Sequence, residues 1–328
     1  MKKAFPYLLT LVLLLFYSCN EKAGQNRFEP SDDLILNDCH VHIMSPTLIE
    51  DWKDLGIPFS RPDYTYWDID TILKKNGAEK INLIGMAYVY GNPDFYQGNE
   101  EYSRVMQEND FLFESANKYK DIIKPFFAID PLKDYAIDEI RRCLEINPNV
   151  GLKLHFNSSQ VYLTEPAHLE KIKLVFQVAA EHSLPILLHF DNSHPKFGKP
   201  DIELLIDEVL ADVQPIELTI AHFGTSGGFN QKTRDFLDTF ISLFEEGRIS
   251  KAHNIKFDIS AVALDKDSEG VKKLTDEEFK ELKKYCDRLG YDKIIFGTDY
   301  PLYSAVEYKD LLRNRLNLSK TELKEINQ

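Results

Sequence analysis

The sequence lacks several features that would place it in other classes of protein. Its 328 residues include only 4 cysteines, at unrelated spacings, which excludes a disulfide-stapled scaffold. Lysine and arginine form no cluster and the net charge is -14, so we expect no nucleic-acid partner. After the first twenty residues no apolar run is long enough to cross a bilayer, and there is no close repeat. The composition, 43% hydrophobic and 28% charged, suits one large globular α/β domain.

The first residues have the organisation of an export signal. A short basic stretch is followed by the apolar run 8–16 and by a small residue, Ser18, directly before Cys19. The position of Cys19 resembles that of the lipid-modified cysteine of bacterial lipoproteins. We therefore expect a lipoprotein signal peptide at 1–18, lipidation of Cys19 and a polar tether at 19–33. The protein would then be exported and anchored by lipid to the membrane of the bacterial cell envelope, on the periplasmic or surface side. An uncleaved anchor and a free Cys19 after ordinary cleavage are the alternatives.

From residue 34 onward, short apolar runs alternate with longer amphipathic segments. The runs are rich in Ile, Leu, Val and Phe and are continuous, as in parallel strands buried on both faces. They lie at 34–40, 81–88, 123–130, 150–156, 185–190, 217–223, 254–260 and 293–299. Eight strands alternating with helices predict a (β/α)8 TIM barrel, as a single domain at residues 34–328. A doubly wound open sheet is the structural alternative.

Helical signals occupy the segments between these runs. In 164–182, apolar residues recur at helical spacing after Thr164, which can cap a helix. An apolar stripe at 236–244 predicts a second helix. Thr275 and Glu278 form a capping box that predicts the start of a third.

Histidine and aspartate gather at the C-terminal ends of the predicted strands, where barrel enzymes build their sites. His40 and His42 close the first strand, His189 the fifth, His222 the sixth and Asp299 the eighth. Because His40 and His42 are two residues apart, both side chains point to the barrel interior. A His-x-His pair, a further imidazole and a carboxylate suit Zn²⁺, with Fe²⁺, Mn²⁺ or Co²⁺ as substitutes. Each residue alone could be a hydrogen-bonded structural residue, but together they are costly to desolvate unless something pairs them.

The motifs DCHVHI, GLKLHF, PILLHF, LTIAHFG and IIFGTDYP, in this order, resemble the amidohydrolase superfamily and in particular its amidohydrolase-2 branch. The resemblance covers residues 34–303. It implies one divalent metal, expected to be Zn²⁺, with four ligands: His40, His42, His189 and Asp299. It also implies that His222 orients or deprotonates the water or polarises the substrate. Asp299 can hold the ion and accept a proton as well.

Strand four carries two further candidates, Lys153 and His155, which should both face the barrel interior. We expect them to bind substrate beside a single metal, because the GLKLHF form resembles the mononuclear branch of the family. In binuclear amidohydrolases a carboxylated lysine at the end of this strand bridges two metals. If Lys153 had that role, His189 and His222 would bind the second ion.

These features predict a metal-dependent hydrolase of the amidohydrolase type, which uses a metal-activated water on a C–N or C–O bond of a small carbonyl substrate. The same metal cage serves nonoxidative decarboxylases and hydratases of small organic acids, which is the main alternative. The export signal favours hydrolysis, because such decarboxylases usually act on intracellular catabolites. A non-catalytic, anchored binding lipoprotein on a barrel scaffold is a third reading, and the complete set of expected ligands argues against it.

Overall fold

The computed structural model describes residues 34, 36–56, 66–268 and 270–327. The predicted signal peptide, Cys19 and the tether lie outside these residues, as do residues 57–65. Within the described chain, no helix has both the length and the apolar character needed to span a membrane.

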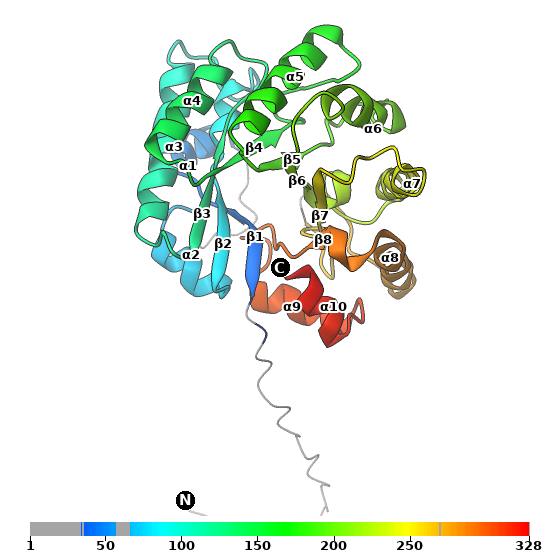
Figure 1. Cartoon of the computed structure of the whole chain (residues 1–328). Coiled ribbons are helices and arrows are strands. Elements are labelled where there is room, and N and C mark those ends of the chain that lie inside the picture. Colours follow the sequence, from blue (N-terminus) through cyan, green and yellow to red (C-terminus); the bar gives the residue numbers. More distant parts are fainter. Residues whose placement is uncertain (1–33, 35, 57–65, 269, 328) are drawn as a thin grey trace, which may run out of the picture. The chain divides into compact units, whose positions relative to one another are not determined.

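Eight parallel strands form the centre of the domain and pair in chain order from β1 to β8. Helices cover the outside of the ring (Figure 1). The strands are β1 (Asn37–His42), β2 (Lys80–Ile84), β3 (Ile123–Ala128), β4 (Gly151–His155), β5 (Ile186–His189), β6 (Glu217–Ile220), β7 (Asn254–Asp258) and β8 (Ile294–Ile295). The predicted (β/α)8 TIM barrel is confirmed, and the open-sheet alternative is wrong.

Ten α-helices surround the strands in the described part of the chain. They are α1 (Pro46–Asp54), α2 (Ile69–Asn76), α3 (Glu101–Asn117), α4 (Ala136–Ile146), α5 (Pro166–Glu181), α6 (Lys199–Leu204), α7 (Gln231–Glu245), α8 (Asp276–Leu289), α9 (Ala305–Asn314) and α10 (Lys320–Ile326). The predicted capping box opens α8, with Thr275 accepting from the backbone N–H of Glu278. The predicted cap at Thr164 is wrong, because Pro166 takes the first helical position and so Glu165 occupies the extended N-cap position.

Several strands end before their apolar runs do. The run at 81–88 leaves the sheet after Ile84 and continues into a short 3₁₀ helix, η1 (Ala87–Gly91). A second 3₁₀ segment, η3 (Ala221–Gly224), follows β6 and contains His222, while β8 has only two residues. The backbone is left-handed at His222 (φ 53°) and at Asp299 (φ 54°). These two residues therefore follow the ends of their strands, and the local left-handed backbone sets the direction of their side chains.

The barrel closes between β1 and the segment that follows β8. Backbone hydrogen bonds run from Cys39 N to Phe296 O (3.0 Å), from Tyr300 N to His40 O (3.1 Å) and from His42 N to Tyr300 O (3.0 Å). This seam therefore brings the His-x-His motif of β1 beside the residues on either side of Asp299.

The buried carboxylate of Asp38 forms hydrogen bonds to both sides of the same seam. Oδ1 accepts from the backbone N–H groups of His40 and Thr298, both at 3.0 Å. Oδ2 accepts from Thr298 Oγ1 at 2.5 Å and from Asn76 Nδ2 at 2.7 Å. Burial raises the pKa of Asp38 to about 7, and these four hydrogen bonds oppose that rise. One side chain thus fixes the backbone of His40 and of the residue next to Asp299.

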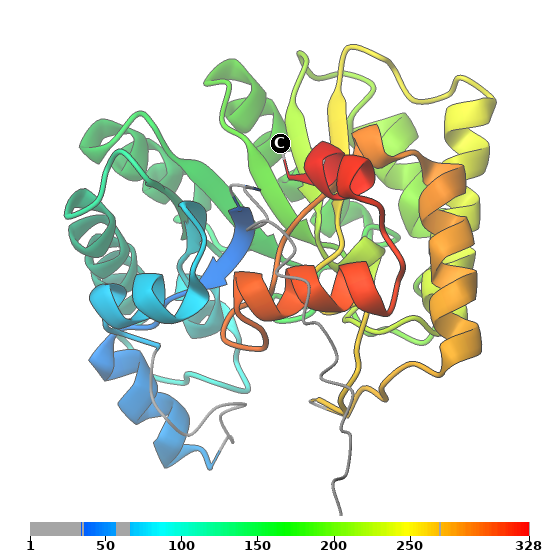
Figure 2. The same ribbon diagram turned by 90° about the horizontal axis from the view of Figure 1, so that it is seen from below.

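The last helix covers the other end of the seam. Phe296 N donates to Ile326 O at 2.7 Å, and Asn37 N donates to the side chain of Asn327 at 2.8 Å. Viewed from below, α9 and α10 lie on the side of the barrel where β1 and the chain around β8 meet (Figure 2). The end of the described chain therefore supports the first and last strands together.

Candidate metal centre

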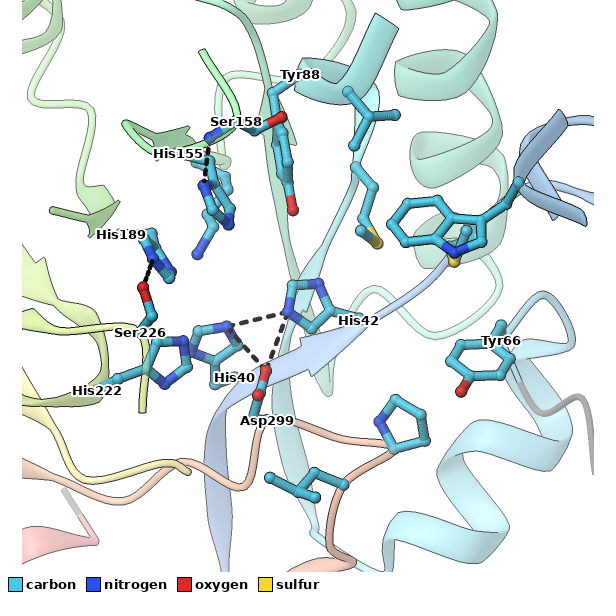
Figure 3. Close-up of a pocket in the computed structure, with 17 residues that line it drawn as sticks. His40, His42, Tyr66, Tyr88, His155, Ser158, His189, His222, Ser226 and Asp299 are labelled. Atoms are coloured by element: carbon cyan, nitrogen blue, oxygen red, sulfur yellow. Dashed lines mark hydrogen bonds and ion pairs between the residues drawn. The ribbon is translucent and has the colours of Figure 1, made fainter. Parts of the chain in front are cut away.

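The C-terminal ends of the strands surround a cavity of about 300 Å³. All seven residues predicted for the site line it, and Figure 3 shows six of them by name. They are His40, His42, Lys153, His155, His189, His222 and Asp299. The structure thus brings together residues from β1, β4, β5, η3 and the loop after β8, although their individual roles stay predictions.

Three of the four predicted metal ligands converge closely. His40 Nε2 lies 3.1 Å from His42 Nε2 and 3.5 Å from Asp299 Oδ1, and His42 Nε2 lies 3.2 Å from the same oxygen. Ligand atoms bound about 2.0–2.2 Å from a divalent ion are separated by roughly 3.0–3.5 Å in octahedral or tetrahedral geometry. The donor set and its spacing therefore fit a divalent cation.

Asp258, at the end of β7, sets the orientation of His40. His40 Nδ1 lies 2.5 Å from Asp258 Oδ2, and both side chains are fully buried. The other carboxylate oxygen accepts from Ser260 N at 2.6 Å. Because His40 donates its Nδ1 proton to the carboxylate, its Nε2 keeps a lone pair toward His42 and Asp299. Such a carboxylate–histidine pair is the usual support of a metal-binding imidazole.

His222 is held by the loop after β7. Its Nδ1 donates to the backbone oxygen of Ser260 at 3.0 Å, and the Ser260 hydroxyl lies 2.9 Å away. The ring stacks on His40, with centroids 4.8 Å apart. This arrangement leaves Nε2 of His222 as its hydrogen-bond acceptor. The left-handed backbone at His222 is strained for a residue with a side chain, as is common at functional sites.

His189 lines the cavity but is turned toward a different partner. Its Nε2 lies 3.3 Å from the hydroxyl of Ser226 rather than among the three converging ligand atoms. Its ring stacks on His155, 3.9 Å between centroids, because these two residues are register partners on β4 and β5. His189, the fourth predicted ligand, therefore lies in the same cavity but is hydrogen-bonded to Ser226 in this structure.

Lys153 and His155 present hydrogen-bond donors to the cavity. His155 Nδ1 accepts from Ser158 N at 3.2 Å, so the ring carries its proton on Nε2. Lys153 is 1% exposed and lines the cavity, and in the described part of the chain no carboxylate lies within ion-pair distance of its amine. Burial lowers the pKa of Lys153 to about 8. An incompletely paired buried cation is costly, and an anionic or strongly polar ligand would offset that cost.

Burial controls the charge of the histidines as well. It lowers the pKa of His42, and it lowers those of His40, His155 and His189 well below the ordinary value, so these rings are neutral at neutral pH. Burial acts to raise the pKa of Asp299, but its neighbours His222, His42 and His40 outweigh that effect and hold the pKa below the ordinary range. Neutral imidazoles and an ionised carboxylate are the protonation states that bind a metal.

Sequence reasoning missed two residues of the site. Asp258 lies inside the apolar run NIKFDIS, and a carboxylate within a buried strand is a signal that could have marked it. Ser226 lies in the glycine-rich segment GTSGG, which reads as a plain loop. The aromatic part of the wall also went unpredicted, and it is formed by Trp52, Tyr66 and Tyr88.

Comparison with known proteins places this geometry in a family. The family model for amidohydrolase (Amidohydro_2) matches residues 38–325. No curated protein matches the sequence significantly. Three solved structures illustrate the likeness of fold, and each is less than 20% identical to this chain.

The first is 2,6-dihydroxybenzoate decarboxylase from Rhizobium, with 16% identity, a TM-score of 0.58 and coverage of 89% of this chain and 96% of the other. The second is a probable 2-pyrone-4,6-dicarboxylic acid hydrolase from Acinetobacter baumannii, with 14% identity, a TM-score of 0.56 and coverage of 90% and 97%. The third is 5-carboxyvanillate decarboxylase from Novosphingobium aromaticivorans with bound manganese, with 13% identity, a TM-score of 0.60 and coverage of 91% and 96%. Together with the match over residues 38–325, the barrel and its histidine–aspartate cluster identify this chain as a member of the amidohydrolase-2 family of enzymes.

Proposed function

We propose that the protein is a metal-dependent hydrolase that adds water to a C–N or C–O bond of a small carbonyl substrate. The observation that carries this proposal is the convergence of His40, His42 and Asp299 at 3.1–3.5 Å beside His222. It combines a cation site with two groups that can exchange protons, within a cavity sized for a small molecule.

The ion would be held by His40, His42 and Asp299, with His189 as the fourth ligand. Mixed imidazole and carboxylate donors suit Zn²⁺, and Mn²⁺, Fe²⁺ and Co²⁺ fit the same set. A divalent ion bound there supplies a Lewis acid for the carbonyl and lowers the pKa of water toward about 7.

The protein's own groups then move the protons. Asp299 Oδ1, beside the two Nε2 atoms, is placed to accept a proton as water adds to the carbonyl. Nε2 of His222 is free to accept a proton and to return it to the leaving group, because Nδ1 is fixed on Ser260. His222 and Lys153 are buried, whereas the side chain of Asp299 is 24% exposed toward the cavity.

Substrate would be oriented by the donor wall. The Nζ group of Lys153 and the Nε2–H of His155 can donate to a carbonyl oxygen, to the oxyanion formed from it or to a substrate carboxylate. This role assumes one metal per chain. Carboxylation of Lys153 would instead create a bridge to a second ion bound by His189 and His222.

A metal analysis with matched histidine variants tests the proposal. The protein is expressed from residue 20 onward, its metal content is measured, and amides, lactones and carboxylic acids are screened for turnover. We expect about one equivalent in the parent and in His182→Ala, a control because His182 is exposed at the end of α5. We expect loss of metal in His40→Ala. No metal, with none taken up from added Zn²⁺ or Mn²⁺, would refute the metal site, and two equivalents would support a carboxylated Lys153.

A nonoxidative decarboxylase is the second candidate, because the cavity has the surface that a planar acid needs. Trp52, Tyr66 and Tyr88 line it together with Met44 and Met86, and the ring of Tyr88 lies against that of His155, 4.7 Å between centroids. Two of the similar structures named above are decarboxylases of aromatic acids. The screen separates the two reactions, because decarboxylation releases CO₂ from an acid without consuming water, whereas hydrolysis yields two fragments or an opened ring.

We also propose that the enzyme acts at the cell envelope, anchored by a lipid on Cys19. The basic and apolar start of the sequence supports this location. Cells expressing the full chain or its Cys19→Ser variant would be fed a labelled fatty acid and then fractionated. Label and membrane association are expected in the parent and not in the variant. Equal fractionation without label would refute the anchor.

A further inference from the structure

A hydrogen-bonded chain of polar side chains extends from the cavity behind His189. Its Nε2 lies 3.3 Å from the hydroxyl of Ser226, as Figure 3 shows, and that hydroxyl lies 3.2 Å from Oδ2 of Asp191. Lys232 Nζ lies 3.2 Å from both carboxylate oxygens of Asp191. Ser226 lines the cavity, Asp191 is 3% exposed and the side chain of Lys232 is 39% exposed, so a cavity histidine is linked to a buried carboxylate that is paired with a partly exposed amine.

The carboxylate of Asp191 sets the direction of these hydrogen bonds. The Ser226 hydroxyl has a single proton, and a carboxylate is a stronger acceptor than a neutral imidazole. Ser226 therefore donates to Asp191 and accepts from the Nε2–H of His189. In this state the lone pair of the His189 ring is on Nδ1.

This arrangement is the opposite of the one at His40. There a carboxylate holds the proton on Nδ1 and frees Nε2, whereas Ser226 holds the proton of His189 on Nε2 itself. One nitrogen cannot bind a proton and an ion with the same lone pair. For His189 to ligate through Nε2, the bond to Ser226 has to break and Nδ1 has to take up a proton as Nε2 loses one.

We propose that Ser226, held by Asp191 and Lys232, is a positioning residue that competes with the metal for Nε2 of His189 and so weakens metal binding. The inference rests on the proposed function, in which His189 is the fourth ligand. Ser226 then acts on the metal only through His189. Its hydroxyl makes the centre exchange its ion more readily than the ligand set alone would.

Metal affinity without any substrate tests this competition. Chelator-treated protein is titrated with Mn²⁺ alone, and the Kd is measured for the parent and for Ser226 variants. Ser226→Ala is expected to bind roughly three- to tenfold more tightly, the effect of one net hydrogen bond. Ser226→Thr retains a hydroxyl and should stay close to the parent. Ser158→Ala is the matched control, because the backbone N–H of Ser158, and not its hydroxyl, contacts His155.

The outcomes separate this inference from the proposed function. A parent-like or weaker Kd for Ser226→Ala, at an unchanged melting temperature, would overturn the competition and leave the metal site in place. If that variant does not fold, Ser226→Gly removes the same hydroxyl. If His189→Ala binds Mn²⁺ as tightly as the parent, His189 is no ligand and the inference fails while the three-residue centre stands. Failure of the parent to bind any divalent ion would refute the proposed function itself.

Discussion

Replacing Asp258 with asparagine tests how the metal centre is supported. Asp258 uses both carboxylate oxygens, because Oδ1 accepts from Ser260 N at 2.6 Å and Oδ2 accepts from His40 Nδ1 at 2.5 Å. Asparagine has only one acceptor oxygen. If that oxygen stays on Ser260 N, the amide NH₂ faces His40 and the ring has to move its proton from Nδ1 to Nε2. That proton then occupies the lone pair that the ion needs.

The size of the effect follows from this change of tautomer. Losing an outer-shell carboxylate typically weakens metal binding by about 10- to 100-fold, or roughly 1.4–2.7 kcal/mol. The loss of metal affinity in Asp258→Asn should lie at the upper end of this range, because asparagine disfavours the tautomer of His40 that carries its proton on Nδ1. Asp258→Ala should bind metal more tightly than Asp258→Asn, because the Ser260 hydroxyl, 3.3 Å from His40 Nδ1, can still accept the proton.

The assay is Mn²⁺ titration of chelator-treated protein, with the melting temperature of each metal-free variant as the control for folding. Alanine leaves a small cavity and is expected to melt lower than asparagine, so affinity and stability should rank the two variants in opposite order. A parent-like Kd for Asp258→Asn would refute the idea that Asp258 fixes the tautomer of His40.

Three further predictions concern other buried groups. His222→Ala should keep its metal but lose about 10²- to 10⁴-fold in kcat, measured on whichever substrate the screen yields; full turnover would contradict the assigned proton transfer. Lys153→Met should raise KM at least about tenfold without lowering the melting temperature, because its amine has no ion pair to lose in the described chain; an unchanged KM would remove Lys153 from substrate binding. Glu108, on α3, accepts from Ser45 N at 2.9 Å, and burial raises its pKa from 4.5 to about 7. Its contribution to stability is therefore fully present below about pH 4.5 and is lost as the pH rises through about 7, by up to about 3 kcal/mol. Urea unfolding of metal-free protein at pH 5 and pH 8 should show a smaller difference in Glu108→Gln than in the parent, and equal differences would refute this shift.

The barrel could be predicted from the sequence because its strands are continuous apolar runs. The ends of those strands could not, because apolar residues continue past the last ladder hydrogen bond. The run 293–299 illustrates the limit: only Ile294 and Ile295 form a strand, and the backbone of Asp299 is left-handed. Periodicity reports which residues are buried, whereas the end of a strand depends on the pairing partner.

Some residues of the candidate site could likewise be predicted from the sequence, and others could not. Histidines at strand ends are visible in the sequence, and all of those chosen line one cavity. Their supporting residues are not visible, since Asp258 contacts His40 across 218 residues of chain. The contact of Ser226 with His189 could not be predicted either, because it depends on how the loop after β6 folds against the end of β5. Sequence patterns therefore predict candidate ligands, and the structure supplies the groups that set their tautomers.

The seam between β1 and β8 has a consequence for how the protein is made. Asp38 and Thr298 are 260 residues apart, yet their hydrogen bonds bring His40 and Asp299 into one cluster. During synthesis the two histidines of β1 leave the ribosome long before Asp299 does. The cluster therefore lacks this carboxylate until nearly the whole barrel has emerged. The complete cluster thus arises only in a finished, closed ring. An ion bound by all three residues would cross-link the first strand and the segment after the last one. Binding of metal by the complete cluster would therefore indicate that the barrel has closed.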